Sequence, residues 1–160
     1  MLSIQVTDIK DCMQKLLSGD CFDQFYLVET TVQMGISYYL DGHLNHDFYD
    51  SETNESISRD YCFWKEARPL VFQIIRGRRL PLGFKTVLAL PEKSVEFLLR
   101  ESQGSYTADD IEGIYVNIRF EPGSLQITTG ISYRTFSLDR SLEHCVDDHI
   151  ASFLKKHGIC

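Results

Sequence analysis

Length, composition and charge limit the classes of protein to which this chain can belong. Its 160 residues are 43% hydrophobic, 12% aromatic and 24% charged, which predicts a single globular domain over residues 1–160 and excludes a collagen-like, disordered or membrane-embedded chain. The 16 basic and 23 acidic residues give a formal charge of −7. This charge argues against general polyanion binding but leaves room for a local basic patch.

The cysteines and the N-terminal residues bear on the compartment. Five cysteines are scattered along the chain, and none forms a C-x-x-C pair, which is typical of a reducing environment. Residues 1–11 lack the basic and apolar regions of a signal peptide, and no apolar run reaches the length of a membrane span. We therefore expect a cytoplasmic protein in which Cys12, Cys62 and Cys145 are buried, unreactive thiols.

The first half of the chain predicts strands and helices in a definite order. Alternation over 2–6 predicts a strand, and an apolar stripe over 9–17 predicts a helix. Residues 22–40 are rich in aromatic and β-branched side chains and predict further strands. Asp41-Gly42 predicts a tight hairpin turn, because this dipeptide tolerates positive φ. The polar and acidic residues 45–60 predict an exposed, mobile loop.

The middle of the chain predicts a helix that ends near Gly77. Apolar residues recur with helical period and predict that Phe63, Ala67, Val71 and Ile74 are buried. Pro69 either kinks this helix or begins a second one, because proline lacks an amide donor.

The second half of the chain is largely β-like between two helices. A strand over 84–90 is followed by a helix that Pro91 opens. Alternating residues predict strands over 114–120 and 125–129 with a turn between them, and another strand over 130–138. A last helix runs from Asp139 or Ser141 to His157.

This order of elements suggests an internal repeat. A strand, a helix and three strands over 2–44 precede an inserted helical segment over 45–80, and the same order returns over 84–142. Gly35-Ile36-Ser37-Tyr38 recurs as Gly130-Ile131-Ser132-Tyr133. We predict an α+β fold whose antiparallel sheet comes from two strand–helix–three-strand halves, with a C-terminal helix. In the alternative, two amphipathic hairpins merely look alike.

Two resemblances extend this prediction. Asp41-Gly42-His43-Leu44, the segments 64–69 and 81–85, and the stretch 123–142 resemble a family of small uncharacterised proteins from anaerobic Firmicutes, which implies no activity. Residues 114–133, with a turn followed by Leu-Gln-Ile-Thr-Thr-Gly, look like a half-repeat of a DNA sliding-clamp domain. That resemblance implies a clamp-like fold with DNA on the helical face, although the first predicted helix and the helix that Pro91 opens carry net charges of only zero and −1.

One segment of the chain is strongly basic. Residues 61–86 hold six basic residues and one acid, a net charge of +5. We predict an anion or nucleic-acid site that uses the side chains of Arg76, Arg78, Arg79 and Lys85. The alternative is that these residues complement a helix C-terminus and pair with the acidic loop before them.

Two clusters of histidine and aspartate are chemically suited to a divalent metal ion. His43, His46 and Asp47 lie close together in one segment, and His144 and Asp148 share one face of the last predicted helix. The alternative is a solvated polar surface, since no H-E-x-x-H spacing is present. The sequence contains no motif for a nucleotide or other cofactor, so we expect none.

These observations favour a non-catalytic binding or interaction protein. Its expected partners are another protein or a weakly bound nucleic acid, and the expected state is a monomer or homodimer without membrane contact. The alternative is a small metal-dependent enzyme that uses the two clusters of histidine and aspartate.

Overall fold

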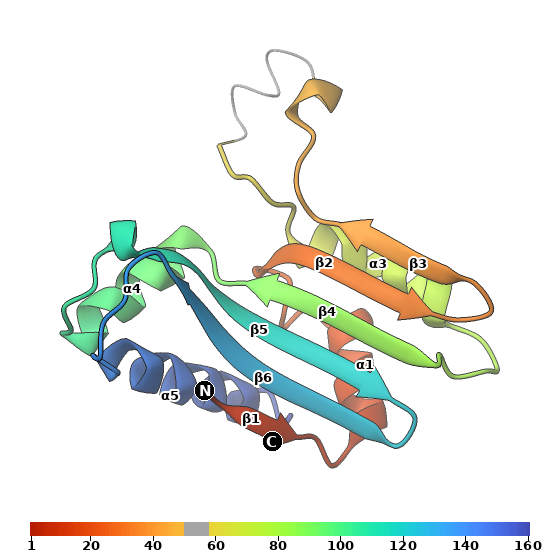
Figure 1. The fold of residues 1–160 in the computed structure, drawn as a ribbon. Coiled ribbons are helices and arrows are strands. Elements are labelled where there is room, and N and C mark those ends of the chain that lie inside the picture. The colour runs from red at the N-terminus through yellow and green to blue at the C-terminus, as the bar shows by residue number, and fades with distance from the viewer. Residues whose placement is uncertain (50–57) are drawn as a thin grey trace.

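The computed structural model describes residues 1–49 and 58–160 (Figure 1). One antiparallel sheet has the strand order β1-β6-β5-β4-β2-β3. Its strands are β1 (Ser3–Gln5), β2 (Tyr26–Gln33), β3 (Ser37–Asp41), β4 (Gly83–Ala89), β5 (Ile111–Glu121) and β6 (Ser124–Tyr133). The α-helices are α1 (Ile9–Leu17), α3 (Trp64–Ile75), α4 (Glu92–Ser102) and α5 (Ser141–Lys156), and 3-10 turns cover His46–Phe48 and Ala108–Asp110. The predicted α+β class, antiparallel sheet and C-terminal helix are confirmed.

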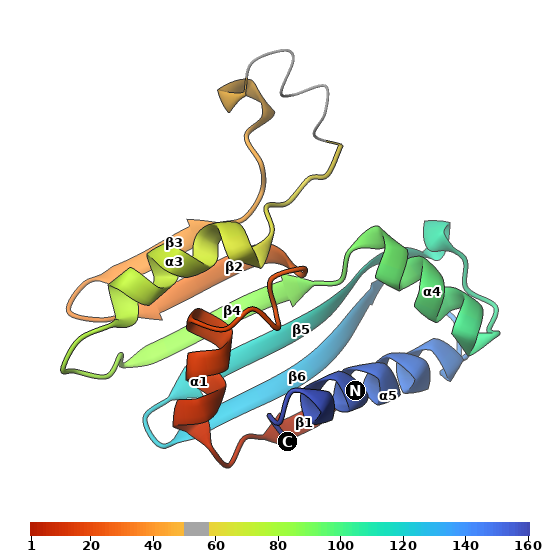
Figure 2. The ribbon, with the colours of Figure 1, turned by 180° about the vertical axis from the view of Figure 1, so that it is seen from behind.

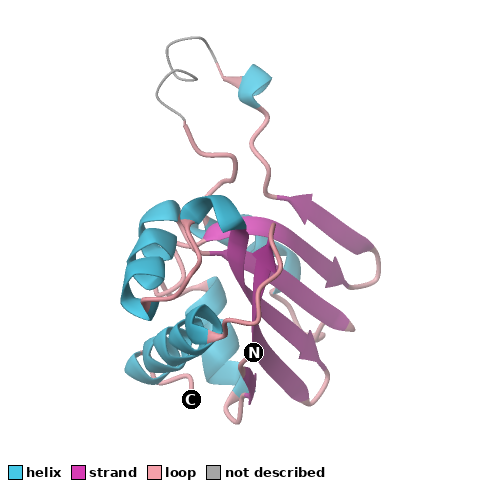
Figure 3. Ribbon diagram, turned by 60° about the vertical axis from the view of Figure 1, so that its left-hand side comes forward, coloured by secondary structure: helices cyan, strands magenta, loops and turns pink. Residues whose placement is uncertain are grey.

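The α-helices lie on one side of the sheet and cover its apolar face (Figures 2 and 3). Alternation along β5 turns Ile114, Val116 and Ile118 toward the helices, where each is at most 1% exposed. Leu16 of α1 and Val146 of α5 are buried in the same core. Among the described residues, no helix is long and apolar enough to span a membrane.

Helix α3 differs in detail from the prediction. It begins at Trp64, so Trp64 and Val71 are fully buried, whereas Phe63, Ala67 and Ile74 are only partly buried. The set of buried residues differs from the prediction because the helix begins at Trp64. The helical face that holds Trp64 and Val71 therefore points into the core. Pro69 begins no second helix and lies inside one continuous helix over Trp64–Ile75.

Asp41-Gly42 does not form the predicted hairpin turn. Asp41 is the last residue of β3. The chain then runs on beside β2, where the Gly42 N–H donates to the Val28 carbonyl at 2.9 Å. A Cβ on Gly42 would lie 1.8 Å from the Leu27 carbonyl oxygen. Glycine is needed here because two backbone segments approach closely, and not because of a positive φ.

Each half of the chain has fewer strands than predicted. After the first strand and helix, β2 and β3 follow in the first half, and β5 and β6 in the second. The first part of the predicted strand over 130–138 is the end of β6, because the pairing with β5 runs from Ser124 through Tyr133, with one register shift between Ile111 and Gly113. Strand β6 stops at Tyr133. Gly35 lies in the β2–β3 connection, whereas Gly130 lies inside β6 opposite Tyr115. The internal duplication stays a prediction.

The polar stretch over 45–60 is only partly described. His46–Phe48 forms a 3-10 turn, and Tyr61 returns to the sheet through an antiparallel bridge to His43. Residues 50–57, on which much of the predicted mobile loop falls, lie outside the described residues.

Asp139 connects the start of α5 to the segment after α4. Its carboxylate accepts hydrogen bonds from the Ser105 N–H at 2.9 Å, from the Ser141 N–H at 2.9 Å and from the Ser105 hydroxyl at 3.0 Å. The backbone N–H groups of Ser105 and Ser141 hold the pKa of Asp139 below its ordinary value. The ionised carboxylate therefore stabilises the junction between two helical segments.

We expect Asp139→Asn to lower the free energy of unfolding at neutral pH. Because the pKa is lower in the folded state, the stabilisation is complete above the ordinary pKa of about 3.9 and is lost as the pH falls through the native pKa. The difference between the variant and the natural chain should therefore shrink between about pH 5 and about pH 2. Urea unfolding followed by circular dichroism at several pH values measures this, and a difference that does not change with pH would contradict it.

Candidate functional site

The face of the sheet opposite the helices is uncovered in the described part of the chain (Figures 1 and 3). Along β4 and β5, side chains that point to this face alternate with core residues. Lys85 lies between the buried Phe84 and Thr86, and Arg119 lies between Ile118 and Phe120. This open face is mainly polar, which distinguishes it from the apolar face under the helices.

A row of six side chains, one from each strand, crosses the open face. None of the six is acidic. Strand register pairs Arg119 with Lys85 and with Gln126, and the row continues to both edges of the sheet. Six strands at spacings of about 4.8 Å make the row about 24 Å long. We name it the open-face stripe, and it consists of Tyr39, Thr31, Lys85, Arg119, Gln126 and Gln5.

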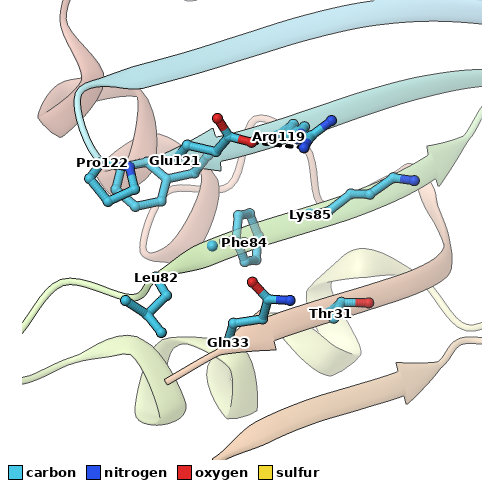
Figure 4. A pocket seen from close by; sticks show the side chains of 10 residues that line it. Thr31, Gln33, Leu82, Phe84, Lys85, Arg119, Glu121 and Pro122 are labelled. Carbon is cyan, nitrogen blue, oxygen red and sulfur yellow. Dashed lines mark hydrogen bonds and ion pairs between the residues drawn. The ribbon is translucent and has the colours of Figure 1, made fainter. Parts of the chain in front are cut away.

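A pocket of about 620 Å³ lies at the basic centre of the stripe (Figure 4). Lys85 and Arg119 line it from neighbouring strands, and Gln33 and Leu82 line it from the side of β2 and the α3–β4 connection. No carboxylate of the described residues forms an ion pair with Lys85. Two adjacent cations with amide and hydroxyl neighbours form a suitable site for an anionic oxygen group.

Glu121 is the one acid in the pocket lining. Its Oε1 lies 2.7 Å from Arg119 Nη2, and both side chains are more than half exposed. An exposed ion pair of this kind contributes little to stability in water. An incoming anion therefore competes with a weakly held carboxylate for the guanidinium group.

The predicted basic residues do not all meet at this pocket. Arg76 directly follows α3. Arg78 and Arg79 lie exposed in the connection that leads into the start of β4, which is the end of the strand that lines the pocket. Leu82 of this connection lines the pocket, but the three arginines do not. None of them forms an ion pair with a described acid, so the alternative of pairing with the acidic loop has no support in residues 1–49 and 58–160.

The two clusters of candidate metal ligands lie on different elements. His43, His46 and Asp47 follow β3, whereas His144 and Asp148 are exposed on α5. Within the described ranges, no group of three or more His, Cys, Asp or Glu side chains is arranged to hold a metal ion. These residues therefore give the metal-dependent alternative no support.

The three cysteines that were predicted to be buried are poorly suited to nucleophilic chemistry. Burial raises the pKa of Cys12 to about 12 and also raises the pKa values of Cys62 and Cys145. A thiol with a raised pKa is protonated at neutral pH and reacts slowly. Cys12 is buried as predicted, while Cys62 and Cys145 are only partly buried.

The sequence reasoning missed Arg119 and the rest of the stripe. Alternation of Ile118 and Phe120 with polar residues contained the signal that Arg119 points to the open face. The pairing of Arg119 with Lys85 depends on strand order and register. Neither is visible in the spacing of one strand.

Comparison with known proteins identifies a family but no activity. The model of a family of unknown function (DUF5721) matches residues 15–160. No curated protein matches the chain, and no solved structure does. The expected membership of an uncharacterised family is confirmed, while the bacterial group and the sliding-clamp resemblance stay predictions. The chain belongs to the DUF5721 family.

Proposed function

We propose that this protein is a non-catalytic binding protein that holds single-stranded nucleic acid weakly, and without sequence preference, on the open-face stripe. The observation that carries the proposal is the acid-free row of polar, aromatic and basic side chains across all six strands. The absence of a disulfide among the five cysteines is compatible with a cytoplasmic location, which is part of the proposal.

The side chains of the stripe match the parts of a single strand. Lys85 and Arg119 supply positive charge for phosphates, and Arg119 offers a planar donor group. Tyr39 is 63% exposed, so its ring is accessible for stacking on a base, while its hydroxyl donates to Glu29 Oε2 at 3.2 Å. Gln126 and Gln5 add amide groups, which both donate and accept hydrogen bonds and can therefore contact the sugars or bases of any sequence. Flat sheet surfaces that combine such groups are a common platform for single strands.

The binding should be weak because few phosphates are contacted. The stripe supplies two cations, and the connection before β4 adds Arg78 and Arg79 at the same end of the sheet. Two to four phosphate contacts give a slope of log affinity against log salt of roughly −1.4 to −2.8 on a single strand. The net charge of −7 opposes binding further. Lys85 and Arg119 of the stripe alternate with buried residues that face the helices, so they lie on the other face of the sheet, whereas the clamp resemblance implied DNA on the helical face.

We expect the double variant Lys85→Gln, Arg119→Gln to weaken binding of a labelled single strand about tenfold at low salt. The slope should become less steep by about 1.4, since two phosphate contacts are lost. Fluorescence anisotropy at several salt concentrations measures both quantities. Glu121→Gln should strengthen binding, because it removes the carboxylate that pairs with Arg119.

A matched control distinguishes the effect of losing the stripe's contacts from the effect of changing the net charge. Lys155→Gln with Lys156→Gln makes the same change in charge at the end of α5 and should leave the affinity nearly unchanged. Arg78→Ala with Arg79→Ala tests the connection before β4 and should reduce the slope by up to about 1.4. Equal losses in the stripe variant and the α5 variant would overturn the proposal. No binding at high micromolar protein would also overturn it and would favour a protein partner on the open face.

A further inference from the structure

A second cavity, of about 240 Å³, lies at the opposite end of β4 from the pocket with Lys85. The tyrosine side chains of Tyr26, Tyr61 and Tyr115 line it, together with residues from the start of α4 and the start of β5. Sites for drug-sized ligands usually measure about 300–1,000 Å³. This cavity is smaller, so it fits a group of the size of a side chain better than it fits a nucleotide. We name it the tyrosine pocket.

Contacts within the protein hold the tyrosine side chains in place. The rings of Tyr26 and Tyr61 are stacked with centroids 6.2 Å apart, and the Tyr26 hydroxyl donates to Glu92 Oε2 at 2.5 Å. The Tyr115 hydroxyl lies over Gly113, where a Cβ would come within 2.6 Å of Tyr115 Oη. The pocket is therefore formed by the protein alone, which lowers the cost of ordering it around a ligand.

Four carboxylates surround the same cavity, and its lining contains no Lys, Arg or His. No described residue forms an ion pair with any of them, although Tyr26 donates to Glu92 and Ser132 donates to Glu112. The stretch 50–57 contains no basic residue either. The four acids of the lining are Asp60, Glu92, Glu96 and Glu112.

Arg59 lies beside the pocket, but its side chain does not line it. Its guanidinium group pairs with Glu66 at 3.1 Å and lies 4.4 Å from the centroid of the Phe63 ring. It also donates from Nε to the Tyr61 carbonyl at 2.9 Å. The guanidinium charge of Arg59 is therefore already paired with Glu66, a carboxylate outside the pocket lining.

We propose that the tyrosine pocket binds an organic cation that carries a primary ammonium or guanidinium group. Aromatic ring faces attract such cations, and carboxylates pair with their N–H donors. The source is either a free polyamine or the Lys or Arg side chain of a partner protein. This function is separate from the open-face stripe, because the ligand has the opposite charge and the pocket lies at the other end of β4.

The test is an NMR titration of the full chain with two probes. Spermidine represents a free polyamine, and Nα-acetyl-lysine methylamide represents a side chain of a partner. Each probe that binds should shift the amide signals of Tyr61, Gly113 and Tyr115. Glu92→Gln with Glu112→Gln keeps the shape of the lining, removes two charges and should weaken binding at least tenfold. Glu101→Gln with Asp148→Asn makes the same charge change at exposed positions outside the pocket and should change the affinity less than twofold.

A second pair of variants tests the aromatic wall without changing charge. Tyr115→Phe keeps the ring and should bind within about twofold of the natural chain, whereas Tyr115→Leu should bind about fivefold more weakly. Binding of spermidine alone assigns a free polyamine, and binding of the lysine probe assigns a protein side chain. If neither probe binds at millimolar concentration, or if the control variant loses as much affinity as the pocket variant, the proposal is overturned.

Discussion

Replacing Trp64 with alanine should destabilise the protein by about 3–5 kcal/mol. The side chain is fully buried at the start of α3, and its Nε1–H donates to the Leu16 carbonyl of α1 at 2.9 Å. Alanine would leave a cavity where the indole ring joins the two helices, and it would leave the buried carbonyl without this donor. Both effects act in the same direction.

Denaturant unfolding followed by far-UV circular dichroism measures this loss without using the tryptophan signal. Leu70→Ala is the control on the same helix, because Leu70 is 53% exposed, and we expect it to change stability by no more than about 0.5 kcal/mol. A loss below about 1 kcal/mol for Trp64→Ala would contradict the burial of this ring.

A second large effect is expected from Gly42→Ala, which should cost about 3 kcal/mol. The added Cβ would lie 1.8 Å from the Leu27 carbonyl oxygen, and both positions are fixed by backbone hydrogen bonds. Relief requires movement of the segment that carries His43 and its bridge to Tyr61. The tyrosine pocket should be distorted as well.

The control for this variant is Gly35→Ala. A Cβ at Gly35 meets no atom within 4 Å, so the substitution should change stability by no more than about 0.5 kcal/mol. Thermal unfolding of the two variants at one pH compares them directly. Equal stability of the two variants would contradict the prediction, because it would show that the backbone at Gly42 moves to accept a Cβ at little cost in free energy.

Local patterns predicted much of the fold because they depend on neighbouring residues. Alternation located β5 and the first part of β6, and Pro91 correctly marked the start of α4. The errors lie where distant segments meet. The closeness of Gly42 to Leu27 depends on the path of the chain after β3, and the burial of Trp64 depends on α1 packing against α3.

The candidate site was predicted less completely for the same reason. A run of basic residues identified Lys85, but it also included Arg76, Arg78 and Arg79, which do not line the pocket. Arg119 is separated from Lys85 by 34 positions and becomes its neighbour through the pairing of β4 with β5. Charge clusters in sequence therefore predict sites less well than charge clusters across strand register.

The claim that the open face binds nucleic acid is tested most directly by NMR mapping. A labelled sample of the full chain is titrated with a short single strand at low salt, and the shifts of the backbone amides are placed on the structure. We predict that the largest shifts occur at Lys85, Arg119 and Gln126 and at their neighbours on the open face. Shifts confined to α1, α3 and α5, or no shifts at high micromolar concentration, would contradict the claim.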